Sequence, residues 1–218
     1  NSKSNVPTPI EQDTKKEVYG AFANANLGYK NMLYLDASAR NDISSALPVD
    51  KNSYFYWSTA LSFVFSEVLD LSFLDFGKVR VNYAEVGNDT GPQRTTTAYT
   101  AVDPFGSAVL ISYPSTVNNP NLKAEKLKSW EAGLELAALK KRLTFDLALY
   151  QTLSQDQIVS VELSKATGAS FKWLNGGEIE NKGIELTLGY DIIKNDNFSW
   201  NATANWAKNV SEVKSLAP

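Results

Sequence analysis

The chain has 218 residues, of which 43% are hydrophobic and 21% charged, a balance typical of a folded protein and a length that suits one large all-β domain. It contains no Cys and no His, which excludes Cys- or His-ligated zinc sites, disulfides and His-based catalytic triads. The formal net charge is -3, and no run of Lys or Arg forms a phosphate-binding stripe. We therefore expect no nucleic-acid partner.

Apolar and polar side chains alternate along eight segments, and no segment shows a helical stripe. In chain order the segments are residues 17–30, 33–40, 55–66, 78–83, 130–136, 143–150, 184–190 and 199–206. These alternating runs have 6 to 14 residues, close to the roughly ten that a tilted strand needs to cross a bilayer. The pattern predicts β-strands with one apolar and one polar face.

The third segment shows the two faces most clearly. One face carries Phe55, Trp57, Thr59, Leu61, Phe63 and Phe65, and the other carries Tyr56, Ser58, Ala60, Ser62 and Ser66. A soluble β-sandwich that binds carbohydrate also alternates in this way and is the alternative. Aromatic residues at the ends of apolar faces, such as Tyr19, Tyr29, Trp200 and Trp206, favour a membrane β-barrel, because they suit interfacial girdles.

The connections between the segments alternate in length. Residues 139–141 and 194–197 are short turns, whereas residues 88–125 and 151–177 are long and rich in Gly, Ser, Thr and Pro. Residues 69–77 are expected to be a longer connection at the end of the sheet that otherwise has short turns. We expect this connection to hold a helical turn. Outer-membrane barrels have short periplasmic turns and long external loops, so we predict an antiparallel, up-and-down sheet.

Several segments resemble the SusC/RagA-type TonB-dependent outer-membrane transporters of Bacteroidota. Residues 119–126 (NPNLKAEK) and 129–135 (SWEAGLE) look like that family's NPNLKPEK and WEAGLE motifs, with Ala124 in place of the usual Pro. Residues 177–186 (GEIENKGIEL) are similar to a further family segment. Residues 36–42 (DASARND) and 81–88 (VNYAEVGN) fit the same branch.

The resemblance implies a transmembrane β-barrel of 22 strands, of which this chain would supply about eight or nine. Residues 1–218 would all belong to the barrel domain, without the plug domain or the terminal strands. The implied location is the outer membrane, as a multi-pass barrel in contact with lipid. The implied partners are a SusD-like lipoprotein, TonB acting through the plug, and a glycan or peptide substrate.

The chain opens at Asn1 without an initiator Met or a signal peptide, so we expect an internal or processed piece of a longer protein. It could also be a component of a larger outer-membrane assembly. We expect no enzymatic activity, no cofactor and no metal. Glu178, Glu180 and Glu185 could suggest the paired carboxylates of a glycosidase, but they lie together in a family motif without a catalytic task.

Charged side chains on the polar faces are the first candidate site residues. They are Arg40, Asp42, Arg80, Glu131, Glu135, Asp146 and Glu185. Because unpaired buried charge is costly, we expect them to meet water, the plug or one another. They would line the transport path or contact the plug; the alternative is that they pair across strands and hold the wall together.

Aromatic residues in the long loops are the second set of candidates. They are Tyr99, Phe105, Tyr113, Phe171 and Trp173. They could contact a ligand or a lid protein, or instead anchor each loop to its own barrel.

Overall fold

The computed structural model describes residue 11 and residues 13–216, and within them nearly all regular structure is β-strand. The eight long strands are β1 (Val18–Tyr29), β2 (Leu33–Ser44), β3 (Ser53–Val64), β4 (Leu74–Asn88), β8 (Glu125–Ala138), β9 (Leu143–Gln155), β12 (Glu178–Lys194) and β13 (Ser199–Ser215). The short elements are β5 (Thr100–Phe105), β6 (Ala108–Ser112), β7 (Thr116–Val117), β10 (Ile158–Glu162), β11 (Phe171–Asn175) and the 3-10 turns η1 (Phe65–Glu67) and η2 (Lys165–Thr167). In this described part of the chain, no helix is long and apolar enough to cross a membrane.

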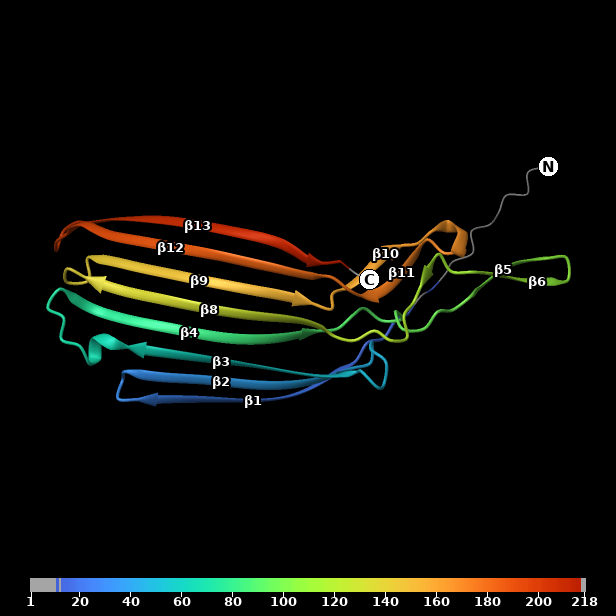
Figure 1. Cartoon of the computed structure of the whole chain (residues 1–218), viewed down its shortest axis with the longest axis horizontal. Coiled ribbons are helices and arrows are strands. Elements are labelled where there is room, and N and C mark those ends of the chain that lie inside the picture. The colour runs from blue at the N-terminus through green and yellow to red at the C-terminus, as the bar shows by residue number, and fades with distance from the viewer. Residues whose placement is uncertain (1–10, 12, 217–218) are drawn as a thin grey trace.

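The eight long strands form one sheet in the order β1-β2-β3-β4-β8-β9-β12-β13, and every neighbouring pair is antiparallel. Each strand therefore pairs with the long strand that precedes it in the chain, as Figure 1 shows. The predicted all-β, up-and-down architecture is confirmed.

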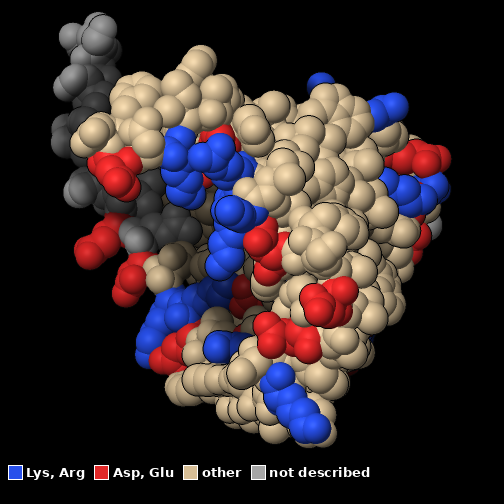
Figure 2. All heavy atoms as spheres, turned by 90° about the vertical axis from the view of Figure 1, so that its left-hand side faces the viewer, with Lys and Arg blue, Asp and Glu red and all other residues tan. Residues whose placement is uncertain are grey.

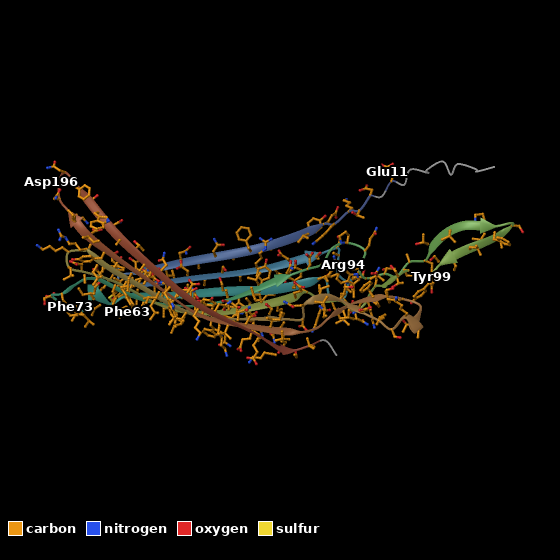
Figure 3. The ribbon with its side chains drawn as sticks, turned by 90° about the horizontal axis from the view of Figure 1, so that it is seen from above. Glu11, Phe63, Phe73, Arg94, Tyr99 and Asp196 are labelled. Atoms are coloured by element: carbon orange, nitrogen blue, oxygen red, sulfur yellow. The ribbon has the colours of Figure 1, made fainter. Side chains whose placement is uncertain are left out.

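The two ends of the sheet differ in their connections. At one end, here called the turn end, β1–β2, β8–β9 and β12–β13 are joined by three or four residues, and β3–β4 by residues 65–73, which include η1. At the other, the loop end, residues 45–52, 89–124 and 156–177 connect the strands, and the β5–β6 hairpin projects farthest (Figure 1). In Figure 3, which views the molecule from above, Phe63 and Phe73 lie at the turn end, and Arg94 and Tyr99 at the loop end.

The boundaries of three predicted segments were wrong. Phe65 and Ser66 do not continue the third strand but form η1, and β4 already begins at Leu74, inside the predicted connection. The helical turn expected in that connection lies a few residues earlier. β9 continues to Gln155, so the second long loop starts later than predicted. In each case the residues before and after the strand boundary have similar polarity, so the sequence pattern does not mark the boundary.

The strand registers divide the side chains between two faces. The inner face carries Ser38, Arg40, Ser58, Arg80 and Glu131, and the outer face carries Leu61, Val81, Leu134, Leu147 and Leu186. Viewed from the turn end, the molecule is hollowed on one side, and acidic and basic side chains lie intermixed around the hollow (Figure 2).

The outer face is covered by no second layer within the described residues. Val81 is 48% exposed, Leu149 47%, and Trp206 53%. A β-sandwich would bury this face against another sheet, so the structure does not favour the soluble alternative. An apolar surface that spans eight strands is what contact with hydrocarbon requires.

We predict that Leu147→Arg in the full-length protein lowers the free energy of unfolding in lipid by about 2–4 kcal/mol, because Leu147 lies midway along the outer face between Leu134 and Leu186. Guanidinium unfolding in vesicles measures this cost. The control is Thr187→Arg, which places the same charge on the inner face beside Asp146. Equal costs for the two variants would contradict the assignment of the faces.

Candidate functional site

The largest charge cluster on the inner face is centred on Arg80 of β4. Its guanidinium Nη1 donates to Glu135 Oε1 at 2.7 Å and to Asp146 Oδ2 at 3.2 Å, and Nε donates to Glu131 Oε1 at 3.3 Å. Lys78 Nζ lies 2.8 Å from the same Glu135 oxygen. Three carboxylates from β8 and β9 thus share two cations from β4, which ties three strands together on one face.

Two glycines make room for large side chains on the inner face. A Cβ atom on Gly133 would lie 2.5 Å from Arg80 Nε, and one on Gly183 would lie 2.6 Å from Tyr150 Cε1. Each glycine is the register partner of the residue that covers it. The glycines of the WEAGLE and GEIENKGIEL motifs therefore serve close approach between neighbouring strands.

A second cluster lies nearer the loop end, on β2 and β3. Arg40 Nε donates to Asp42 Oδ1 at 2.8 Å, and the Tyr56 hydroxyl donates to Asp42 Oδ2 at 2.7 Å. Asp42 is 5% exposed, so the two donors replace the water that its carboxylate would otherwise bind. Phe22 of β1 lies under the Arg40 guanidinium, with 5.9 Å to the ring centroid.

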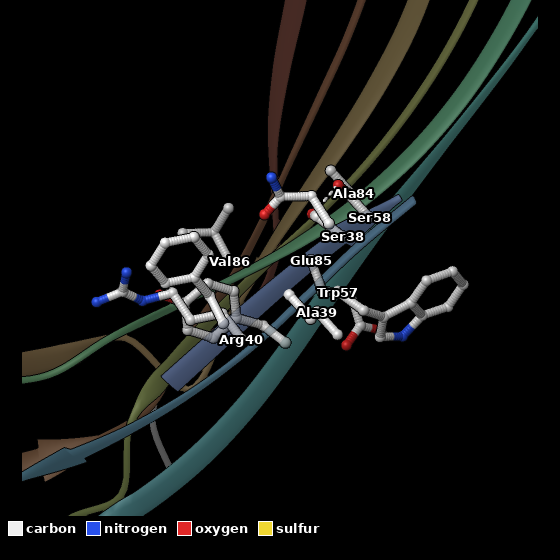
Figure 4. Close-up of a pocket in the computed structure, with 12 residues that line it drawn as sticks. Ser38, Ala39, Arg40, Trp57, Ser58, Ala84, Glu85 and Val86 are labelled. Carbon is white, nitrogen blue, oxygen red and sulfur yellow. Dashed lines mark hydrogen bonds between the residues drawn. The ribbon is translucent and has the colours of Figure 1, made fainter. Parts of the chain in front are cut away.

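Between the two clusters the inner face is polar but mostly uncharged. A hollow of about 320 Å³ is lined there by residues that include Phe22, Arg40 and Val86, and an adjacent one of about 460 Å³ by residues that include Asn24 and Asn82. In Figure 4 the Arg40 and Trp57 side chains point away from each other, because they belong to opposite faces of the sheet. The first hollow is lined mostly by apolar surface and the second by polar and apolar surface in similar amounts, so both are open depressions in the inner face.

The three glutamates of the 177–186 motif do not converge. Glu185 lies on the inner face beside Ala148, whereas Glu178 and Glu180 lie on the outer face. Glu178 accepts from Gln155 Nε2 at 2.7 Å, and Glu180 lies 3.0 Å from both Lys182 Nζ and Lys214 Nζ. A glycosidase needs two carboxyl groups that face one sugar ring, and this arrangement provides no such pair.

At the loop end, an apolar cluster joins all three long connections. Leu122 has no exposed surface and packs with Leu47 and Ala124, and the partly buried Tyr54, Ile158 and Trp173 pack against this group. Leu122 belongs to the NPNLKAEK motif. That motif therefore supplies the buried side chain on which the loops fold.

Polar contacts reinforce the loop end. Lys16 Nζ lies 2.5 Å from Asp89 Oδ1 and donates to the Thr90 carbonyl at 3.0 Å. Arg94 donates to Thr90 Oγ1 at 3.0 Å, and its guanidinium lies 3.8 Å from the centroid of the Trp173 ring, a cation–π contact between the two longest loops.

Glu17, just before β1, also belongs to this end of the sheet. The neighbouring Lys15 ammonium lowers the pKa of the Glu17 carboxyl, and the Tyr19 hydroxyl acts in the same direction. The Glu17 backbone N–H donates to Ser45 Oγ at 2.9 Å, so the entry to β1 is tied to the β2–β3 loop.

The predicted loop aromatics fall into two groups. Trp173 packs into the loop-end cluster, while Phe171 remains 43% exposed on β11. Tyr99 and Tyr113 contact each other edge to face, with centroids 5.7 Å apart at the base of the β5–β6 hairpin, and Phe105 near its tip is 82% exposed. Of the five predicted loop aromatics, Phe105 is the most exposed and Trp173 is packed into the cluster.

Four of the seven predicted charged residues meet in the Arg80 cluster, Arg40 and Asp42 meet in the second cluster, and Glu185 forms no ion pair among the described residues. Sequence reasoning missed Lys78, although its position two residues before Arg80 places it on the same face. It also missed Lys16, Asp89 and Arg94, for which no local pattern exists.

An antiparallel sheet with one apolar face, one charged face, short turns and long loops defines a section of a barrel wall. The sequence matches the family model described as "TonB dependent receptor-like, beta-barrel" over residues 1–215. The chain belongs to this family.

Curated proteins with similar sequences are TonB-dependent receptors as well. The chain is 28% identical to TonB-dependent receptor P26 of Formosa agariphila over 92% of its own length and 21% of that protein. It is 26% identical to TonB-dependent receptor SusC of Bacteroides thetaiotaomicron over 93% of its length and 21% of that protein. It thus spans about a fifth of the length of the curated relatives.

Solved structures show the same fold. The structure of the RagAB peptide importer in the "closed-closed" state superposes with a TM-score of 0.84 at 26% identity, covering 92% of this chain and 22% of that one. The predicted resemblance to SusC/RagA-type transporters is confirmed.

We predict that Arg80→Ala in the full-length protein costs about 1–3 kcal/mol of folding free energy, because Glu131, Glu135 and Asp146 then repel one another without their shared cation. Guanidinium unfolding measures the cost. Adding Glu135→Gln and Asp146→Asn should restore most of the loss.

Lys78→Gln is the matched control, since it removes a cation with one acidic partner and should cost less than Arg80→Ala. A triple variant as unstable as Arg80→Ala alone would show that charge pairing is not the cause.

Proposed function

We propose that this chain forms part of the barrel wall of an outer-membrane importer that TonB drives and that takes up glycans or peptides. The observation that carries the proposal is the two-faced sheet of eight antiparallel strands, with an uncovered apolar outer face and a charged inner face. The family match and the likeness to SusC and to the RagAB importer support it. All of residues 1–218 would belong to the barrel domain of a larger protein.

The proposed orientation follows from the connections. Long loops of outer-membrane barrels face outward and short turns face the periplasm. The loop end would therefore meet substrate, and β1 and β13, the edges of the sheet, would continue into the rest of the barrel. The wall needs no catalytic residue, because the energy of transport would come from TonB through the plug.

The inner-face clusters would serve the plug and the transport path. The Arg80 cluster holds three carboxylates and two cations, and Glu185 adds a further carboxylate on the same face. This surplus of negative charge suits docking of basic plug residues. In the Arg40 cluster the buried Asp42 carboxylate accepts from Arg40 and from Tyr56, which suits a structural role.

The β5–β6 hairpin would contact a SusD-like lipoprotein lid. Phe105, Val109 and Ile111 are 82%, 81% and 66% exposed, and an isolated two-stranded hairpin gains little stability in water by itself. A partner that covers these side chains would bury apolar surface at the place where substrate enters.

The function is tested with the intact gene in its native host. Uptake of labelled oligosaccharides and oligopeptides should require the protein, and should disappear when TonB is deleted although the barrel is still present in the outer membrane. Uptake that continues at the wild-type rate without TonB would contradict the proposal.

For the lid contact, Phe105→Ser combined with Val109→Ser should weaken capture of the lipoprotein by the full-length transporter by about tenfold, because two exposed apolar anchors are lost. Affinity co-purification from solubilised membranes measures it. Leu139→Ser removes an exposed apolar side chain at the turn end instead and should leave capture unchanged. Normal capture by the hairpin variant would exclude this surface as the contact.

A further inference from the structure

The β5–β6 hairpin pairs with no strand of the main sheet among the described residues. β5 and β6 form a two-stranded sheet of their own, which projects beyond the ends of the long strands in Figure 1. Because an isolated hairpin gains little stability in water, the segments that lead into it determine where it points. We call residues 98–115 the arm, residues 93–97 the first stem and residues 116–119 the second stem.

The second stem is fixed by backbone pairing. Its strand β7 runs parallel to β11 and pairs with Phe171 and Lys172. The Ser115 carbonyl, at the end of the arm, accepts from the Ser170 and Phe171 N–H groups at 2.8 and 3.0 Å. β11 also pairs with β10, so the second stem belongs to a three-stranded sheet at the loop end.

The first stem has no strand to hold it, since residues 89–99 form no regular element. The Arg94 guanidinium lies over the Trp173 ring, and the Arg94 carbonyl accepts from the Asn119 N–H at 2.9 Å. In Figure 3 Arg94 lies beside the ends of the long strands, and Tyr99 lies farther out, in the arm. The course of the first stem therefore depends on a few individual contacts.

Asn118 makes most of the contacts that join the two stems. Its Nδ2 donates to the Gln93 carbonyl at 2.8 Å and to the Thr96 carbonyl at 2.7 Å. Its backbone N–H donates to Thr97 Oγ1 at 3.0 Å. Both partners of the side chain are carbonyl oxygens, which only the nitrogen of the amide can serve, so both of its N–H groups are used.

Asn118 thereby closes a long loop at its base. Gln93 lies 25 residues before it and Thr96 lies 22 residues before it. Bringing such distant segments together lowers chain entropy, and without the tie the first stem and the arm regain that freedom. A binding loop that is ordered in advance avoids this loss of entropy when its partner binds.

From these contacts we propose that Asn118 is a positioning residue, which holds the arm in the orientation that the partner lipoprotein binds. Asn118 does not touch the partner; it transmits the order of the β10–β11–β7 sheet to the first stem, and so fixes both ends of the arm. The inference rests on the proposed lid contact and adds the residue that prepares this contact.

The test compares Asn118→Ala and Asn118→Asp in the full-length transporter. Ala removes both N–H donors, whereas Asp keeps the shape and sets a carboxylate oxygen against the carbonyls of Gln93 and Thr96. Either variant should bind the purified lipoprotein about threefold or more weakly in a titration in detergent, because binding must then order the arm. The loss with Asp should be at least as large as the loss with Ala.

The orientation of the arm is measured separately, without the lipoprotein. Spin labels are attached at Ser107→Cys near the tip and Lys126→Cys on β8, since residues 1–218 contain no Cys. Double electron–electron resonance should give a narrow distance distribution with Asn118 and a broad one in either Asn118 variant. Phe105→Ser combined with Val109→Ser should weaken capture and keep the distribution narrow, which separates contact from positioning.

Asn121→Ala is the matched control. Asn121 lies in the same motif, is exposed, and its side chain forms no hydrogen bond within the described residues; its backbone N–H donates to Asn119 Oδ1 and is retained in the variant. The affinity for the lipoprotein and the distance distribution should both stay at their wild-type values.

A narrow distribution in the Asn118 variants, or an equal loss of affinity in Asn121→Ala, would overturn the inference. Normal capture by Asn118→Ala while the Phe105 and Val109 variant loses capture would overturn the inference alone. Normal capture by all variants would show that the proposed lid contact fails, and the inference with it. TonB-dependent uptake by the same variants tests the proposed import function independently of the arm.

Discussion

Continuous backbone pairing between the eight long strands determines to which face each side chain of the main sheet points. Each strand hydrogen-bonds its neighbours along most of its length, so successive residues must face opposite sides of the sheet. Hydrocarbon offers no partner for a free N–H or C=O group, which makes this pairing obligatory in a membrane. A slip of one residue in β9 would turn Leu147 inward and Asp146 toward lipid.

The motifs that carry the family resemblance contribute to strand and loop packing. Gly133 and Gly183 let Arg80 and Tyr150 lie flat across the neighbouring strand. Leu122 is the buried contact on which three loops meet. These residues let neighbouring strands approach closely and give the three loops a shared buried contact.

The sequence was sufficient to predict the eight strands, their order and their faces, because apolar and polar side chains alternate along the central part of each strand. It did not predict the loop-side ends of β12 and β13, where both faces become polar, nor the short strands within the loops, which lack any period. The candidate charges were placed on the correct face, but their partners depend on inter-strand register. The contact between Arg94 and Trp173 joins two loops far apart in the chain and depends on tertiary structure alone.

The most direct test is a spin-label scan along β9 of the full-length protein in bilayers, one residue at a time from Leu143 to Gln155. Labels at 143, 145, 147 and 149 should collide with dissolved oxygen and be shielded from a water-soluble nickel reagent, while labels at 144, 146, 148 and 150 should behave in the opposite way. Accessibility without a period of two, or nickel contact at 145 and 147, would contradict the two-faced wall.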